Sequence, residues 1–301
     1  MQFKNVAASN VPSSQADANI PPTRVIFNFL TQCNMDCKFC YLDFGEPKTS
    51  LAQWIRIVDH LAGLGSTSLT FAGGDPFIYP DFPRLLRHAK NSNCFSFIQV
   101  DSNGICINST HYQLLQENCD LLGLSLDGSN NAINTVMRGN GKHYDKVCLL
   151  LRELGRSGMK LKVNTVVCRK NLDDLESMAK MLKEFDVKIW SLYEFWSLGS
   201  AVSHATEYAI SQSEFIGVAE RLSKLAPFLK VEFGSVDIRK PSYFFVSHAG
   251  RVYTINREDA GKYVTLGNIF EADIVQRWNA QADRAQTEYR LMNRIQSLAR
   301  F

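Results

Sequence analysis

Three cysteines in the stretch TQCNMDCKFCY are the residues best placed to do chemistry. Cys33, Cys37 and Cys40 are separated by three and two residues, so their thiolates can converge on one short loop. Thiolates are the usual protein ligands of iron–sulfur clusters, so the loop can hold three corners of a [4Fe–4S] cube and leave the fourth iron open. A structural zinc site is the alternative, but it normally needs a fourth Cys or His at matching spacing, and none lies nearby in the sequence.

The elements that must position this loop alternate along the chain. The apolar and aromatic run RVIFNFL predicts a buried strand over 24–30, with the cysteine loop at its C-terminal end. Strands separated by helices of ten to fifteen residues form βαβ units and a parallel sheet, with functional groups at the C-terminal ends of the strands. We therefore expect an α/β fold with helices over 50–64, 81–91, 109–118, 143–158 and 172–185, and further strands over 67–71, 96–101, 121–126, 161–167 and 187–195.

Composition limits the class of protein. The 301 residues are 45% hydrophobic, enough for one large core, and the net charge of +3 is too small to indicate a nucleic-acid-binding surface. No apolar run of membrane-spanning length and no secretory signal is visible, so we expect a cytoplasmic protein that acts on a small molecule. The remaining cysteines are scattered singly, and we interpret them as reduced, mostly buried thiols: Cys94, Cys106, Cys119, Cys148 and Cys168.

We expect three segments along the chain. Residues 1–22, rich in Asn, Ser, Ala and Pro, predict a flexible lead-in. Residues 23–197 carry the alternating core, and the alternation stops beyond them. Residues 198–301 predict a C-terminal α+β cap with a helix over 212–226, a strand over 229–235, a β-hairpin over 243–255 and a terminal helix over about 272–298.

The spacing CxxxCxxC, with the aromatic Phe39 directly before the last cysteine, resembles the signature of the radical S-adenosylmethionine (SAM) superfamily. The resemblance implies a partial (β/α)6 TIM-like barrel, in keeping with six predicted strands. It also implies one [4Fe–4S] cluster on Cys33, Cys37 and Cys40, with SAM bound to the open iron and Phe39 near the adenine. An electron from a flavodoxin- or ferredoxin-type donor would cleave SAM, and the resulting 5′-deoxyadenosyl radical would take a hydrogen atom from the substrate.

Motifs at the ends of the following strands extend the resemblance. AGGDP over 72–76 is similar to the family's GGEP motif, with Asp75 in place of Glu, and its carbonyls and carboxylate would receive the methionine ammonium. DSNG over 101–104 is similar to a TNG motif, Ser125 matches a position that contacts SAM, and the Arg138 guanidinium suits the methionine carboxylate. A turn-forming role is the alternative for Ser102, Asn103 and Asp127. The implied SAM contacts are Gly73, Gly74, Asp75, Ser102, Asn103, Ser125 and Arg138.

Two predicted strands carry polar residues among apolar ones. Period-two alternation places Lys162 and Asn164 on one face of the fifth strand, and Trp190 and Glu194 on one face of the sixth. We expect Asn164 to face the cofactor. We do not assign Lys162 to a ligand or to solvent, because lysines at strand starts commonly extend to solvent. A buried carboxylate without a partner is costly, so we expect Glu194 to bind a hydroxyl or amine of the substrate.

Within the superfamily, viperin-like nucleotide dehydratases and cytosylglucuronate decarboxylase-type enzymes are similar at the level of motifs. KVNTVV over 162–167 resembles the viperin KINSVI, and the Ser-Tyr pair ending at Tyr243 resembles one whose tyrosine donates hydrogen. The two basic residues that help viperin hold a triphosphate are replaced by Ile189 and Ser191. We therefore favour a lyase reaction on the sugar of a nucleoside or nucleotide, cytosylglucuronate decarboxylase-like, with a viperin-like triphosphate dehydratase as the alternative. The expected catalytic residues are Tyr243 and Glu194.

A protein of another class is the remaining alternative: a catalytically inactive iron–sulfur or zinc-binding interaction protein. The successive matches at strand ends count against it, because an inactive protein does not need a set of SAM-contacting residues. No cysteine follows Cys168 in the sequence, so we expect no second cluster.

Overall fold

The computed structural model describes residues 19–42, 49–256, 258–259 and 261–299, so most of the predicted lead-in segment, residues 1–18, lies outside the described part. The strands are β1 (Arg24–Leu30), β2 (Ser68–Gly73), β3 (Phe97–Ser102), β4 (Leu121–Ser125), β5 (Leu161–Val167), β6 (Val187–Glu194), β7 (Lys230–Gly234), β8 (Phe245–Ser247), β9 (Arg251–Ile255) and β10 (Tyr263–Asn268). The α-helices are α1 (Leu51–Gly63), α2 (Phe82–Asn91), α3 (Tyr112–Asn118), α4 (Asn131–Arg138), α5 (His143–Arg156), α6 (Leu175–Leu182), α7 (Ala205–Tyr208), α8 (Gln212–Leu225), α9 (Val236–Arg239), α10 (Ile274–Asn279) and α11 (Arg284–Ala299).

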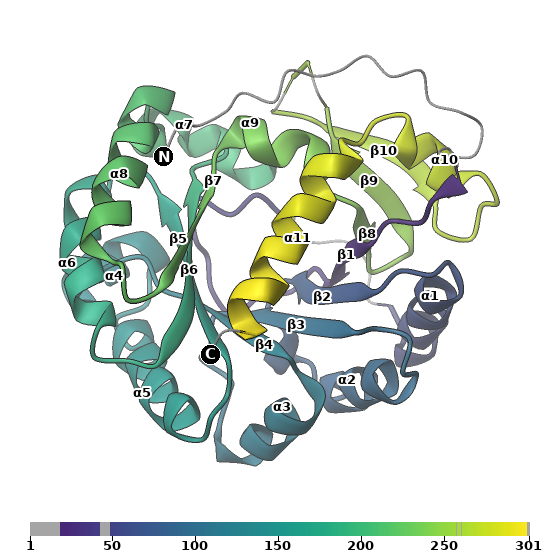
Figure 1. Ribbon diagram of the computed structural model, residues 1–301, viewed down its shortest axis with the longest axis horizontal. Coiled ribbons are helices and arrows are strands. Elements are labelled where there is room, and N and C mark those ends of the chain that lie inside the picture. Colours follow the sequence, from purple (N-terminus) through teal and green to yellow (C-terminus); the bar gives the residue numbers. More distant parts are fainter. Residues whose placement is uncertain (1–18, 43–48, 257, 260, 300–301) are drawn as a thin grey trace.

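The strands form one curved sheet in the order β10-β9-β8-β1-β2-β3-β4-β5-β6-β7. β1 to β7 pair in parallel in chain order, β8 pairs in parallel with the other edge of β1, and β9 and β10 continue antiparallel. Figure 1 shows α1, α2, α3, α5 and α6 around the outside of this sheet. No pairing joins β7 to β8 in the described chain, so the barrel is open there. The expected α/β partial barrel is confirmed, with β7 and β8 as additional parallel strands.

The apolar core lies between the outer face of the sheet and the helices. Phe29 of β1 meets Trp54 of α1 edge-on at 5.0 Å and stacks on Phe82 of α2 at 5.4 Å between ring centroids. Burial of each such side chain stabilises the fold by roughly 1.5–3 kcal/mol. The side chain of Ser50 accepts the Gln53 N–H and so fixes the start of α1. Among the described helices, none has the length and apolar character that a membrane span requires.

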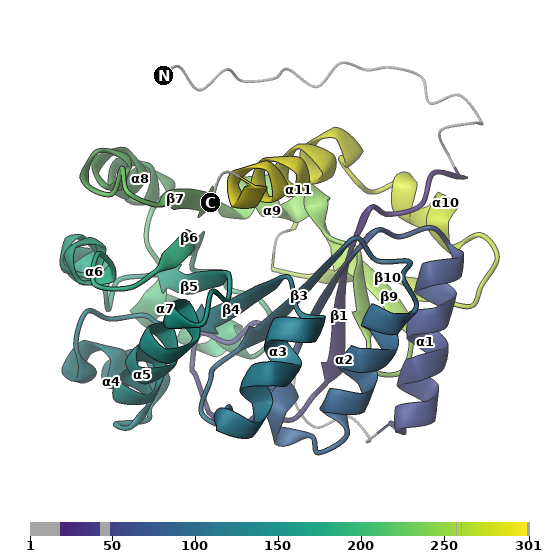
Figure 2. The same cartoon turned by 60° about the horizontal axis from the view of Figure 1, so that its bottom comes forward.

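Helix α11 closes the end of the barrel at which the strands begin. Leu298 clusters with Phe97, Leu121 and Ile189, which lie at or near the starts of β3, β4 and β6. Figure 2 shows α11 lying across this end of the sheet. Arg294 reaches inside, where it donates to Gln99 Oε1 at 3.0 Å and pairs with Glu232 of β7.

The single terminal helix predicted over 272–298 is wrong, because the chain forms α10 and α11 instead. Trp278 Nε1 donates to the carbonyl of Tyr243, and Thr287 Oγ1 donates to the carbonyl of Ser242. Between these two contacts α10 ends at Asn279 and α11 begins at Arg284. The N–H groups of Gln281 and Ala282 both donate to the Trp278 carbonyl in the intervening turn.

Four other elements, α4, α7, α9 and β10, were not predicted. Helix α4 has eight residues and buries Asn134 and Met137. Its apolar positions Ile133, Val136 and Met137 span little more than one turn, which is too short a pattern to predict a helix. The predicted boundary near residue 197 falls inside the continuous sheet, since β7 pairs with β6, and the three-segment division stays a prediction.

Candidate active site

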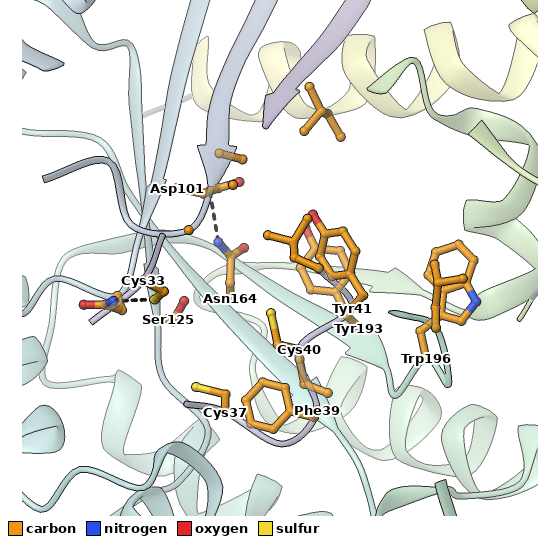
Figure 3. Close-up of a pocket in the computed structure, with 18 of the residues that line it drawn as sticks. Cys33, Cys37, Phe39, Cys40, Tyr41, Asp101, Ser125, Asn164, Tyr193 and Trp196 are labelled. Carbon is orange, nitrogen blue, oxygen red and sulfur yellow. Dashed lines mark hydrogen bonds between the residues drawn. The ribbon is translucent and has the colours of Figure 1, made fainter. Parts of the chain in front are cut away.

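One cavity of about 250 Å³ runs from the C-terminal ends of the strands into the barrel. Cys33, Cys37 and Cys40 line its outer end together, as Figure 3 shows, and all three are free thiols. Asn103 Nδ2 donates to Cys33 Sγ at 3.7 Å, and Arg138 Nη1 donates to Cys37 Sγ at 3.6 Å. The predicted metal ligands therefore meet on one wall of one cavity.

These thiols fit an iron–sulfur cluster. Burial raises the pKa of each thiol, and that of Cys40 to about 12, so iron binding must displace protons. Donors directed at Cys33 and Cys37 suit sulfurs that carry negative charge. In the described part of the chain, no three Cys, His, Asp or Glu side chains are placed to hold a single metal ion. A four-iron cube places its cysteine ligands on different irons, so it does not require three sulfurs to reach one metal ion.

Gly73 and Gly74 hold the cysteine loop against β2. The Gly74 N–H donates to the Leu30 carbonyl at 2.6 Å. A Cβ on Gly74 would lie 1.6 Å from the Gln32 carbonyl oxygen, and Gly73 has a φ of 118°. Only glycine permits this conformation and this approach of two backbones. Both residues also line the cavity, so a ligand in the cavity can reach them, and their contact with SAM stays a prediction.

The structure corrects the role of Asp75. Its side chain is fully buried, and it is absent from the residues that line the cavity. Oδ2 accepts from Ser102 Oγ at 2.8 Å and from Asn103 N at 2.7 Å, while Oδ1 accepts from Phe77 N at 3.0 Å. Burial raises the pKa of Asp75 despite these bonds. Its carboxylate therefore ties the end of β2 to the end of β3, and we assign it to positioning Asn103 rather than to direct contact with the methionine ammonium.

The other predicted SAM contacts line the cavity. The Ser102 hydroxyl is occupied by Asp75 and by the Gly104 N–H, which it accepts at 2.9 Å. The Ser125 hydroxyl has no hydrogen bond within the described chain. Asn164 Nδ2 donates to Asp101 Oδ1 at 3.0 Å, and its Oδ1 is buried without a partner there. Cofactor contact stays a prediction for the whole lining set: Phe39, Gly73, Gly74, Ser102, Asn103, Ser125, Arg138 and Asn164.

Arg138 lies between the cysteine loop and β5. Its Nε pairs with Asp127, whose other oxygen accepts the Val166 N–H at 2.7 Å. Its Cζ lies 4.9 Å from the ring centroid of Phe39. Burial raises the pKa of Asp127, although Arg138 acts against it. The pair fixes the guanidinium so that its terminal nitrogens face Cys37 and the cavity, where the methionine carboxylate is predicted.

The predicted inward face of β6 is wrong. β6 pairs with β5 so that Tyr193 lies beside Val166, and both line the cavity. Glu194 is the next residue and points to the opposite face. Its carboxylate accepts the Val236 N–H at the start of α9 at 2.7 Å, and Trp190 packs in the outer core. The structure therefore places Glu194 outside the cavity, and its predicted contact with the substrate is corrected.

Three arginines that the sequence analysis missed lie at the inner end of the cavity or next to it. Arg24 and Arg239 line it, and Arg290 of α11 lies 6.0 Å from the ring centroid of Tyr243. Within the described chain none of the three forms an ion pair, and Arg24 Nε and Arg290 Nη1 have no hydrogen-bond partner. Burial, reinforced by the charge of Arg294, lowers the pKa of Arg24 to about 10. Strand alternation could have indicated Arg24, but only the fold brings α9 and α11 here.

Tyr243 lies in the cavity wall, as expected. Its ring centroid is 4.7 Å from that of Phe245 and 6.4 Å from that of Trp196. Its carbonyl accepts from Thr254 and Trp278, while its hydroxyl has no hydrogen bond to the described chain. The hydroxyl is therefore free for a ligand, and its role as hydrogen donor stays a prediction.

Comparison with known proteins gives the family. The model of the radical SAM superfamily matches residues 27–182, which is more than half of the chain. An S-adenosylmethionine-dependent nucleotide dehydratase of Flammeovirga pacifica is 29% identical and covers 85% of this chain and 89% of its own length. A protein of the same name from Selenomonas ruminantium is 26% identical and covers 83% and 91%.

A likeness in fold agrees with this match. SuiB of Streptococcus suis, in a structure bound to S-adenosylmethionine, has a TM-score of 0.70 at 16% identity and covers 90% of this chain and 68% of its own. The cysteine loop lies within the matched residues, at the mouth of the partial barrel. The chain belongs to the radical SAM superfamily, whose members use a [4Fe–4S] cluster and S-adenosylmethionine.

Proposed function

We propose that this radical SAM enzyme dehydrates the sugar of a nucleotide. Two relatives named nucleotide dehydratases support the proposal, since each matches most of this chain and most of its own length. When bound, the cluster and SAM supply a radical that removes a hydrogen atom from the substrate. The residues of the chain then bind the nucleotide, direct its sugar toward the cofactor end and exclude water.

The observation that carries the proposal is a group of arginines without carboxylate partners at the inner end of the cavity, of which Arg239 also donates to the backbone carbonyls of Ser235 and Glu194. A buried cation without a counter-charge is costly, and Arg24, Arg239 and Arg290 have no carboxylate partner in the described chain. Guanidinium groups match phosphate in charge and in hydrogen-bond geometry. A nucleotide with its phosphates at these arginines would present its sugar to the end of the cavity lined by the cysteines.

These arginines change which of the two reactions considered from the sequence we favour. The sequence favours a cytosylglucuronate decarboxylase-like reaction because β6 carries Ile189 and Ser191 in place of the two basic residues that help viperin hold a triphosphate. The arginines come instead from β1, α9 and α11, so an anionic substrate can be neutralised. A cytosylglucuronate decarboxylase-like reaction stays a second candidate, because a sugar carboxylate would also pair with an arginine.

The test compares nucleotides with nucleosides. Anaerobically reconstituted protein is given dithionite, SAM and each nucleoside triphosphate or its nucleoside, and products are identified by mass spectrometry. We expect loss of one water from a nucleotide and none from its nucleoside. Arg24→Gln should raise the nucleotide KM roughly 10- to 100-fold, the effect of one charged hydrogen-bond partner. Arg84→Gln, at an exposed site on α2, is the matched control. Loss of carbon dioxide from a nucleoside sugar acid, with every nucleotide unchanged, would contradict the proposal.

A further inference from the structure

Tyr193 and Lys162 form a pair in the cavity wall that the binding of phosphate does not use. They lie on the neighbouring strands β6 and β5, and Lys162 Nζ is 3.0 Å from the Tyr193 hydroxyl oxygen. Lys162 is fully buried, whereas Tyr193 lines the cavity. The sequence did not decide whether Lys162 faces solvent or a ligand, and the predicted inward face of β6 did not include Tyr193. The pair was therefore not predicted.

The hydrogen-bond geometry leaves the phenol proton available. An ammonium group has three donors and no acceptor, so Lys162 donates to the phenol oxygen and the phenol proton is not used in this bond. The Tyr193 hydroxyl has no second hydrogen bond within the described chain. Its proton is therefore free for a group that enters the cavity.

The ring of Tyr193 is held in place. A Cβ on Gly234 would lie 2.8 Å from Tyr193 Cδ1, so β7 packs directly against one edge of the ring. Arg239 Cζ lies 5.5 Å from the ring centroid. The hydroxyl is therefore presented to the cavity in a fixed orientation.

The surrounding charges favour release of this proton. Burial alone would raise the pKa of Tyr193, but the charges of Lys162 and then Arg294 outweigh burial and the nearby carboxylates, and the pKa is lowered to about 8. An acid with a pKa near the working pH is the most effective proton donor. The charged groups that face Tyr193 are Arg24 on β1, Asp101 on β3, Lys162 on β5, Glu232 on β7, Arg239 on α9 and Arg294 on α11.

We propose that Tyr193 is the general acid of the dehydration and that Lys162 positions it and stabilises its phenolate. The inference rests on the proposed function. After a hydrogen atom leaves one sugar carbon, the C–O bond of the neighbouring carbon breaks and its electron pair stays on oxygen. The Tyr193 proton converts the departing hydroxide to water. One electron from a flavodoxin- or ferredoxin-type donor joins the unpaired electron on carbon to complete the double bond, and solvent reprotonates Tyr193.

The first test measures ionisation without turnover. Ultraviolet difference absorbance of tyrosinate, taken between the reconstituted protein and its Tyr193→Phe variant, isolates this phenol. We expect a midpoint near pH 8 that moves above the ordinary tyrosine value of 10.0 in Lys162→Met. A midpoint at or above the ordinary value in the unaltered protein, or one that Lys162→Met leaves in place, overturns the role of the pair.

The second test measures product formed per SAM cleaved. Tyr193→Phe should lower this ratio by about 100-fold or more, the usual contribution of a general acid, while iron content stays unchanged. In the unaltered protein, product formation should fall above about pH 8 as the acid loses its proton, and this fall should move to higher pH in Lys162→Met. Tyr289→Phe, at an exposed site on α11, is the control.

The outcomes separate the two proposals. If the protein dehydrates a nucleotide and Tyr193→Phe retains full product formation, Tyr193 is not the acid and the proposed function stands. If no nucleotide is dehydrated, the proposed function fails and the role of Tyr193 as its acid fails with it, whatever the tyrosinate titration shows.

Discussion

The outer and inner ends of the cavity differ in how their polar groups are satisfied. At the outer end, Asp75, Ser102 and Asn103 bond to one another and to the backbone, and Arg138 pairs with Asp127. At the inner end, Arg24 and Arg290 carry nitrogens without a partner in the described chain. The outer end is thus complete as a scaffold, whereas the inner end lacks counter-charges that a ligand would supply.

This difference indicates two ways of building a site. The outer end is preorganised by short loops at the ends of β1 to β4, so its geometry exists before the cofactor binds. The inner end collects side chains from β1, α9 and α11 around an unfilled volume. We therefore expect substitutions at the outer end to affect cluster and SAM binding, and substitutions at the inner end to affect substrate turnover alone.

The largest effect is expected for the cysteine loop, and it defines the outer end. The Cys33/Cys37/Cys40→Ala triple variant removes the thiolate ligands, so about four irons per chain should fall to near none after anaerobic reconstitution. Iron and sulfide analysis measures this. Cys168→Ala, at a buried site that packs near Phe39 but does not line the cavity, should leave the iron content unchanged. Eight irons per chain in the unaltered protein would contradict a single cluster.

The next effect separates substrate chemistry from cofactor chemistry. Tyr243→Phe keeps the ring packing but removes the hydroxyl that faces the cavity. As the predicted hydrogen donor, Tyr243 would give up its hydroxyl hydrogen, with the electron passing to the substrate and the proton to solvent, and the flavodoxin- or ferredoxin-type donor would then restore Tyr243. Tyr193 would supply the proton of the leaving water. Product should therefore be lost while SAM cleavage continues, as measured by chromatography of both products from one reaction. Full product formation by Tyr243→Phe would remove the donor role.

The two ends also differ in what sequence could predict. The cysteines and the motifs at 72–76 and 101–104 follow predicted strands within a few residues, so local spacing was enough to place them. On β6 the choice of face failed, because a strand buried on both faces shows no clear alternation and Glu194 was the conspicuous residue. Arg290 could not be placed from sequence, because α11 reaches the barrel through tertiary contacts such as that between Thr287 and the Ser242 carbonyl.

A smaller effect concerns SAM binding at the outer end. Arg138→Ala should weaken SAM binding by roughly 1.5–3 kcal/mol, the range for a charged hydrogen-bond partner. Asp75→Ala should also weaken it, because Asn103 loses the carboxylate that accepts its N–H. Equilibrium dialysis of reconstituted protein with SAM measures both. Unchanged affinity for SAM in both variants would show that SAM does not bind beside Arg138 and Asn103.

The smallest effect is expected for Glu194, and it tests the corrected face of β6. In the structure its carboxylate accepts the Val236 N–H at the start of α9, outside the cavity. Glu194→Gln retains an oxygen that can accept this bond, so the nucleotide KM should change by less than about twofold and the free energy of unfolding by less than about 1 kcal/mol. Glu194→Ala leaves the partly buried Val236 N–H without this acceptor and should lower the free energy of unfolding by about 1–3 kcal/mol, with cluster content unchanged. Denaturant unfolding and steady-state kinetics on both variants measure these effects.

The same kinetics separate two roles for Glu194, because α9 also carries Arg239. A large rise in KM for Glu194→Ala but not for Glu194→Gln would mean that the hydrogen bond between Glu194 and the Val236 N–H positions Arg239. A large rise in KM for Glu194→Gln alone would mean that Glu194 contacts the substrate, and that the outward orientation of its side chain on β6 is wrong.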